Sequence, residues 1–274
     1  MQLRSIALAT LAALSLSALQ AQYASKVVGY STGDGFADGY TDPSSALGAP
    51  SRVTPGSFGG PVDPFSGPYL KTQLVSVGTG GSLTVRFDAP VKNSPANPFG
   101  ADFQVFGNSF FVVTNGFDQD FNYIGAPATD GQVFGLGTST TRISVSDDGL
   151  TYFTLSPTLS PDLKSLFPTD GNGDFGKPVD PSVRASDFDG LTLDGVRTLY
   201  GGSGGGTAYD IAWARDGQGN AVALDRINFV RVEVLTGKVE IDGFSAVAVP
   251  EPSTWALVGI GLGALVVIRR QRCR

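Results

Sequence analysis

The sequence lacks histidine altogether and has a single cysteine among its 274 residues. Without histidine, the chain can form neither a Ser-His or Cys-His nucleophile pair nor a His-ligated zinc or haem site. With one cysteine, it can form no internal disulfide and no thiolate-rich metal site. Charged residues are also scarce, at 16% against a usual value of about 25%. We therefore expect a protein without enzymatic activity.

The N-terminal 24 residues have the composition of a secretory signal peptide. Arg4 gives a positive start, an apolar stretch covers residues 6–19, and small residues follow at Ala21 and Ala24. The apolar stretch is too short to span a bilayer stably. We predict export through the secretory pathway with cleavage near Ala21 or Ala24, and an N-terminal membrane anchor is the alternative.

The C-terminal end combines three elements in order. Pro250, Glu251 and Pro252 precede an apolar run at residues 254–268, and four arginines lie within residues 269–274. A helix of the apolar run is about 22 Å long at ~1.5 Å per residue, shorter than a ~30 Å hydrocarbon core. Snorkelling by the flanking arginines can close this gap. We predict a short transmembrane helix whose arginines stay in the cytoplasm, with the preceding residues outside.

This tripartite end resembles the PEP-CTERM sorting signal of Gram-negative bacteria. The resemblance covers residues 249–274 and implies that exosortase, a membrane protease, recognises and processes the signal. It also implies a transient stay in the inner membrane, followed by residence in the cell envelope or outside the cell. An ordinary single-pass anchor that happens to contain Pro-Glu-Pro is the alternative.

The part between the two ends is acidic. Residues 25–253 contain all 25 acidic residues and 14 of the 19 basic ones, so their formal charge is 14 − 25 = −11. Such a charge disfavours nucleic acid and anionic lipid as partners. Among the acidic residues, 22 are aspartate and 3 are glutamate. Aspartate is both a turn residue and a ligand for hard cations, so its excess allows either role.

Residues 25–248 show the period-2 alternation of half-buried β-strands. The candidate strands cover residues 83–87, 101–106, 143–145, 152–155, 208–214, 230–234 and 239–249. The turn at Asp147, Asp148 and Gly149 predicts a hairpin. No stretch shows a sustained 3.6-residue apolar period, and residues 25–72 and 156–190 are rich in loop-forming residues. The pattern predicts one all-β sandwich domain.

Several segments of this domain resemble a recurring ectodomain of PEP-CTERM proteins. They are residues 46–50, 75–83, 100–108, 143–149, 209–212 and 241–244. The resemblance implies a jelly-roll β-sandwich similar to galactose-binding-like and discoidin-like domains, which often carry a structural calcium ion. By this resemblance Asp102, Asn108 and Asp242 are candidate metal ligands, and capping of strand-end amides is the alternative. The pattern has Glu before Asn108, where this chain has Gly107, which removes one possible ligand.

A second candidate calcium site comes from oxygen spacing alone. Asp170, Asn172 and Asp174 alternate with glycines, so that their side chains can converge as at the start of a calcium loop. Phe175 and Pro181 stand where an EF-hand requires Gly and Glu, which argues against an EF-hand. A looser calcium loop and an Asx-rich turn both remain open.

Two other patterns carry weaker signals. The glycine-rich residues 201–206 lack the following Lys-Ser/Thr and helix that a phosphate loop needs, so a plain loop is expected. Aspartate pairs at residues 118/120, 147/148 and 187/189 allow two-carboxylate glycosidase chemistry, although spacing alone does not place them across a cleft. Aromatic residues within 115–123 could stack on sugar rings.

These observations together predict an exported, non-enzymatic protein of the cell surface or exopolysaccharide matrix. Its expected role is structural, adhesive or carbohydrate-binding, with a polysaccharide as the ligand. The alternative is an envelope carbohydrate-active hydrolase that uses aspartate catalysis.

Overall fold

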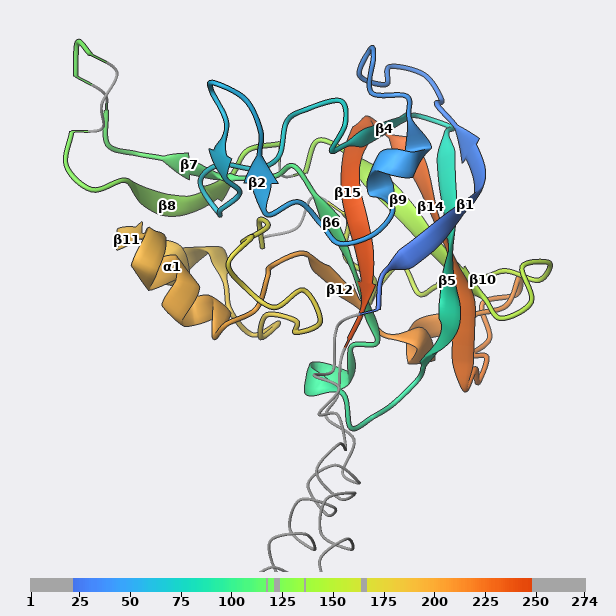
Figure 1. Cartoon of the computed structure of the whole chain (residues 1–274). Helices are drawn as coiled ribbons and strands as arrows, with labels where there is room; N and C mark the ends of the chain where they lie inside the picture. The colour runs from blue at the N-terminus through green and yellow to red at the C-terminus, as the bar shows by residue number, and fades with distance from the viewer. Residues whose placement is uncertain (1–21, 117, 121–123, 136, 164–166, 248–274) are drawn as a thin grey trace, which may run out of the picture. The chain divides into compact units, whose positions relative to one another are not determined.

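The computed structural model describes residues 22–247, except 117, 121–123, 136 and 164–166. Within this part of the chain, every ladder between named strands is antiparallel (Figure 1). No helix among the described residues is long and apolar enough to cross a bilayer. The predicted transmembrane segment, residues 254–268, lies outside the described residues, as does most of the predicted signal peptide.

The larger sheet has six strands. In spatial order they are β1 (Ala24–Ser31), β5 (Ser82–Lys92), β14 (Arg226–Thr236), β9 (Thr140–Ser146), β10 (Phe153–Leu155) and β13 (Ala214–Arg215). Val230 lies opposite Val85 on one side and Val145 on the other, and all three are fully buried. Since side chains alternate between the faces of a strand, this register gathers the apolar residues of three strands on one face.

The second sheet has four strands and supplies the other half of the core. Its order is β12 (Thr207–Tyr209), β6 (Phe103–Gly107), β15 (Lys238–Ala246) and β4 (Val75–Gly78). Phe244 of β15 lies opposite Val105 of β6, and both belong to the same buried cluster as Val85 and Val230 of the larger sheet. One hydrophobic core between two antiparallel sheets is a β-sandwich, so the predicted fold class is confirmed.

Tight turns carry the chain from one sheet to the other. The β14–β15 turn contains Gly237, which has φ of 73°. A Cβ atom at this position would lie 2.2 Å from the Thr138 carbonyl oxygen. The turn therefore requires glycine for both its backbone conformation and its close approach to a neighbouring loop.

A smaller hydrophobic cluster lies apart from the sandwich core. It is built on β7 (Phe111–Val113), β8 (Ala128–Val133), β11 (Leu191–Thr192), helix α1 (Leu193–Tyr200) and a 3-10 helix (Ala185–Phe188). The Phe188 ring lies 4.7 Å from the Phe111 ring and 6.2 Å from the Tyr200 ring, measured between centroids. Part of the loop-rich stretch 156–190 thus has a core of its own.

The remaining elements are short. Strands β2 (Val53–Thr54) and β3 (Gly60–Pro61) form a hairpin, and three further 3-10 helices cover Pro43–Ala46, Pro98–Gly100 and Ile211–Trp213.

The structure corrects two details of the sequence analysis. The predicted strand at residues 208–214 ends at Tyr209, because Asp210 caps a 3-10 helix by accepting a hydrogen bond from the Ala212 N–H. Helix α1 was not expected at all, since its eight residues are too few to establish a 3.6-residue period and Gly195 interrupts it. The jelly-roll topology implied by the resemblance stays a prediction.

The two ends of the described chain lie side by side. Tyr23 bridges to Ser245 in antiparallel fashion, and the Ala246 N–H donates a 2.7 Å hydrogen bond to the Gln22 carbonyl. Ala24 is fully buried in the sandwich core. Gln22, Tyr23 and Ala24 therefore belong to the folded domain.

Candidate functional site

Asp102, a candidate metal ligand, lies directly before β6 and is hydrogen-bonded to two neighbouring segments. Its buried carboxylate accepts hydrogen bonds from the Ser94 N–H at 3.0 Å, the Ile211 N–H at 2.9 Å and the Asn97 side-chain amide at 2.7 Å. Burial raises the pKa of Asp102 to about 6, although these hydrogen bonds oppose the rise. The side chain therefore joins the loop before β6 to the 3-10 helix that follows β12.

Asp242 is a second buried carboxylate, at an irregularity in β15. It follows Ile241, which pairs with Gly107 of β6. Its two oxygens accept hydrogen bonds from the Ser51 N–H and the Ser51 hydroxyl, each at 2.7 Å. The residue is 2% exposed, and this burial raises the pKa of Asp242 to about 7. Asp242 thus fastens the segment before β2 to the four-stranded sheet.

Asn108 lies at the opposite end of β6 from Asp102. Six residue steps along an extended strand separate the two by about 20 Å, so they cannot ligate the same ion. The Asn108 amide instead donates a 2.9 Å hydrogen bond to the Glu240 carboxylate. At Gly107 a Cβ atom would lie 2.6 Å from the Glu240 carbonyl oxygen. A side chain such as the Glu of the related pattern would therefore clash with β15 at this position.

Two arginines engage the oxygens of the loop at residues 170–174. The Arg197 guanidinium donates bidentate hydrogen bonds of 2.8 and 3.0 Å to Asp170, whose side chain is 3% exposed. Arg52 donates to the backbone carbonyls of Gly171 and Gly173, and its guanidinium lies 4.3 Å from the Phe175 ring centre. The loop oxygens therefore face guanidinium groups, which supply positive charge where a cation was expected from the sequence.

The other two residues predicted in this loop are exposed. Asp174 accepts a 2.8 Å hydrogen bond from the Gly176 N–H, which is an Asx turn, and Asn172 lies at the surface. In the described part of the chain, no three His, Cys, Asp or Glu side chains are grouped so as to hold a metal ion. Calcium binding at either predicted set stays a prediction.

The weaker sequence signals correspond to turns and close packing. The Asp148 carboxylate accepts the Leu150 and Thr151 N–H groups at 2.8 Å, which lowers the pKa of Asp148. The Asp187 carboxylate accepts the Arg184 N–H at the start of a 3-10 helix. In the glycine-rich loop, a Cβ atom at Gly205 would lie 2.1 Å from a backbone oxygen. Close backbone packing thus accounts for that glycine.

A cavity of about 540 Å³, called the polar cavity after its two aspartates, one serine and one threonine, was not foreseen from the sequence, and most of its exposed lining is apolar. Its lining consists of Asp63, Phe65, Ser66, Ala126, Pro127, Thr192, Leu193 and Asp194. Asp63 accepts a 2.8 Å hydrogen bond from the Phe65 N–H, and burial raises the pKa of Asp63. Thr192 begins helix α1 without a capping hydrogen bond from its side chain. Two carboxylates and two hydroxyl groups therefore surround this cavity beside an aromatic ring.

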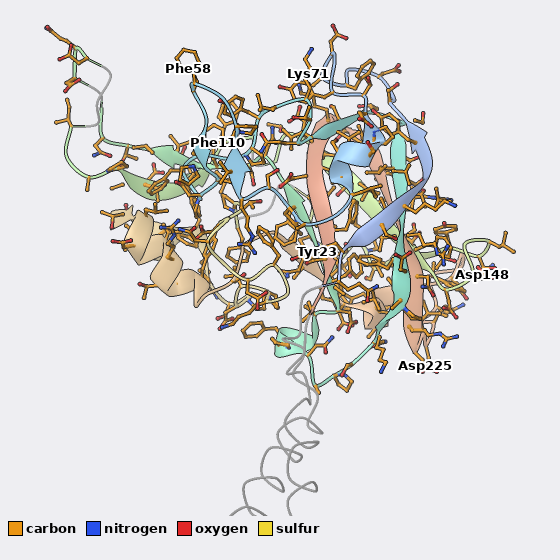
Figure 2. The ribbon with its side chains drawn as sticks, viewed as in Figure 1. Tyr23, Phe58, Lys71, Phe110, Asp148 and Asp225 are labelled. Atoms are coloured by element: carbon orange, nitrogen blue, oxygen red, sulfur yellow. The ribbon has the colours of Figure 1, made fainter. Side chains whose placement is uncertain are left out.

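The β2–β3 hairpin presents an exposed aromatic residue. Phe58 is 94% exposed in the connection between the two strands (Figure 2). The Tyr69 hydroxyl donates a 2.8 Å hydrogen bond to the Phe58 carbonyl, and the Tyr40 hydroxyl donates a 2.6 Å bond to the Tyr69 carbonyl. These contacts hold the hairpin connection in place, and Asp63 of the polar cavity follows two residues after β3.

No motif in the sequence marks the residues that line this cavity or the two arginines. Asp63 and Asp194 lie more than a hundred residues apart and share no motif. The pairing of Arg197 with Asp170 spans 27 residues and depends on where α1 packs. No local spacing in the sequence could have indicated either arrangement.

The predicted sorting residues Pro250, Glu251 and Pro252 lie outside the described residues. No curated protein matches the chain. Residues 248–272 match a family described as the PEP-CTERM protein-sorting motif. This motif indicates exosortase-dependent sorting of an exported surface protein. The chain therefore carries a PEP-CTERM sorting motif at its C-terminal end, as the sequence analysis predicted.

Proposed function

We propose that the sandwich domain is a non-enzymatic carbohydrate-binding module of the cell surface or exopolysaccharide matrix. In this proposal the polar cavity binds a sugar unit of a polysaccharide. The supporting observation is the combination of two carboxylates, two hydroxyl groups and the Phe65 ring around about 540 Å³. A volume of this size falls within the range of small-molecule sites, roughly 300–1,000 Å³.

The chemistry of the lining suits a sugar. Carboxylates such as Asp63 and Asp194 accept hydrogen bonds from sugar hydroxyl groups, and charge assistance strengthens those bonds. Ser66 and Thr192 can both donate and accept. Phe65 adds an apolar surface against which a sugar ring can lie. The anionic charge of the domain favours a neutral or cationic glycan over an anionic one.

Polysaccharide binding by the exported protein tests this proposal. We expect Asp194→Ala to weaken retention on a glycan array at least tenfold. Asp225→Ala, a change at an exposed aspartate away from the cavity lining (Figure 2), should leave binding unchanged. Absence of binding to every glycan, or equal binding by both variants, would contradict a sugar site in this cavity.

The same cavity also supports the hydrolase alternative. Asp63 and Asp194 both line this cavity, and most glycosidases use two carboxyl groups that flank the scissile bond. Under this alternative the wild type releases reducing sugar, and Asp63→Asn abolishes release while binding persists. Binding without release of reducing sugar would support the module.

We also propose that processing at the C-terminal motif proceeds through a transient stage in the inner membrane. The motif contains Glu251 between two prolines, directly before the apolar run. We expect Glu251→Ala to leave unprocessed protein in the inner membrane fraction. If mass spectrometry of the mature wild type still detects residues 255–268, processing before that segment is refuted.

A further inference from the structure

An apolar cleft of about 600 Å³ lies apart from the polar cavity. Its wall is formed by separate segments, among them Phe99 and Ala101 before β6, Val179 from the loop-rich stretch, Ala208 of β12, and Trp213. No lysine or arginine lines it among the described residues. β12 is an edge strand of its sheet, so the cleft runs beside the rim of the sandwich.

Two polar side chains of the cleft, Thr207 and Asp162, already have partners. The Thr207 hydroxyl donates a 2.9 Å hydrogen bond to the Leu163 carbonyl. Asp162 is exposed at the surface, and one of its oxygens accepts the Thr141 N–H at 2.7 Å. A sugar placed in the cleft would leave most of its hydroxyl groups without partners, which disfavours a carbohydrate ligand. The lining suits a hydrocarbon ligand instead.

Two exposed apolar side chains line the cleft, and one of them, Phe99, has a strained backbone. Phe99 is 55% exposed and Leu159 is 50% exposed. Phe99 has φ of 58°, and it is the only non-glycine residue with positive φ in the described part of the chain. Left-handed backbone disfavours a bulky side chain and persists where the surrounding structure imposes it, commonly at binding sites. Hydrogen bonds from the Gly100 and Ala101 N–H groups to the Asn97 and Pro98 carbonyls hold this turn, which leaves the Phe99 side chain exposed at the cleft.

The cleft also lies at the end of the domain where the chain leaves it. Ala101 of the cleft precedes Asp102, whose carbonyl accepts the Val247 N–H at 2.8 Å. Residues 248–253 are the only link between Val247 and the apolar run. These six residues span at most about 21 Å when fully extended. While the apolar run is anchored, this end of the domain cannot move far from the bilayer surface.

We propose that the cleft takes up one acyl chain of a bilayer phospholipid while the protein is anchored in the inner membrane. The proposal rests on the membrane stage of the sorting route proposed above. Phe99, Leu159 and Trp213 supply the apolar and aromatic groups that settle at a membrane interface. The exposed Asp162 carboxylate complements an ammonium headgroup, which favours phosphatidylethanolamine over an anionic lipid.

Tryptophan fluorescence can test the proposal on the full chain. The chain has two tryptophans, so Trp255→Phe leaves Trp213 as the only tryptophan, which is excited selectively over the tyrosines. This variant is reconstituted in phosphatidylethanolamine-containing nanodiscs with either brominated or plain acyl chains. We expect bromine to reduce Trp213 emission at least twofold. In the same background, Ala208→Glu places a charge in the cleft and should abolish the quenching, whereas Phe58→Glu should preserve it.

Two further measurements keep the test decisive. Glycine adopts left-handed backbone without strain, so Phe99→Gly should keep the fold and reduce the quenching of Trp213 emission. Circular dichroism checks that every variant is folded. Equal emission in brominated and plain nanodiscs by a folded protein would overturn the proposal. Failure of the chain to co-purify with nanodiscs would refute both the membrane stage and this proposal. Glycan binding, measured separately, reports on the polar cavity alone.

Discussion

Replacing Asp242 with asparagine should make the domain more stable at neutral pH. The carboxyl group is buried against Ser51 alone, and burial raises its pKa from 3.8 to about 7. Asparagine can keep both contacts, because its oxygen accepts the Ser51 N–H while its amide donates to the Ser51 hydroxyl. The substitution therefore removes a buried charge. The second amide hydrogen and the Ser51 hydroxyl hydrogen then lack the acceptor that the carboxylate provides, and this loss does not vary with pH.

The sign and size follow from linkage between protonation and folding. The folded-state pKa of Asp242 is raised. Between about pH 4 and 7 the carboxyl group is therefore protonated in the folded state and ionised in the unfolded state. Stability from this group is thus fully present below pH ~4 and is lost as pH rises through ~7. A shift of about 3 pKa units corresponds to about 4 kcal/mol at ~1.36 kcal/mol per unit.

Urea unfolding of the exported domain between pH 4 and 8, at constant ionic strength, measures this effect. We expect the stability of Asp242→Asn relative to the wild type to rise by about 4 kcal/mol between pH 4 and pH 8. Asp148→Asn is a matched control of opposite sign, because hydrogen bonds lower the pKa of Asp148. A difference between Asp242→Asn and wild type that does not vary with pH would refute the reasoning.

Three further predictions concern ion pairing, processing and metal binding. Arg197→Met should destabilise the domain by about 3 kcal/mol, because it leaves Asp170 buried without its partner. Arg226→Met removes an exposed ion pair and should destabilise the domain by under ~1 kcal/mol. Chemical denaturation of the two variants measures both values. N-terminal sequencing of the mature protein should begin at Gln22, and a start at Ser25 would show that the domain does not need its first three residues. If calcium binds the predicted aspartates, a chelator should lower Tm at constant ionic strength. An unchanged melting curve would show that these aspartates serve only in turns and at strand ends.

The sequence was sufficient to predict the sandwich because its strands have one buried face. In β5 and β14 the buried positions alternate with half-buried or exposed ones over part of each strand. In β9 the apolar Ile143 and Val145 alternate with serines, and these alternations are visible without a structure. β1 escaped detection because its burial pattern is irregular and it lies at an edge. α1 escaped because eight residues form little more than two turns.

The sorting motif and the internal sites differ in how they are encoded. Pro250, Glu251 and Pro252 with the following apolar run are consecutive, so the sequence alone displays them. Asp170 lies in an oxygen spacing that the sequence displays, yet its pairing with Arg197 depends on where α1 packs. Cavity linings combine segments that only the packing of the sheets brings together, so no local sequence pattern indicates them.

The position of β15 has a consequence for the timing of folding. β15 is the last described strand, yet it lies inside its sheet between β6 and β4. A secretory chain that crosses the membrane N-terminus first delivers β4 and β6 long before the strand that joins them. Until then both strands present unpaired edges, which are prone to mispairing. The sandwich can close only when nearly all of the domain has been translocated, so the sorting motif arrives immediately behind the strand that completes the fold.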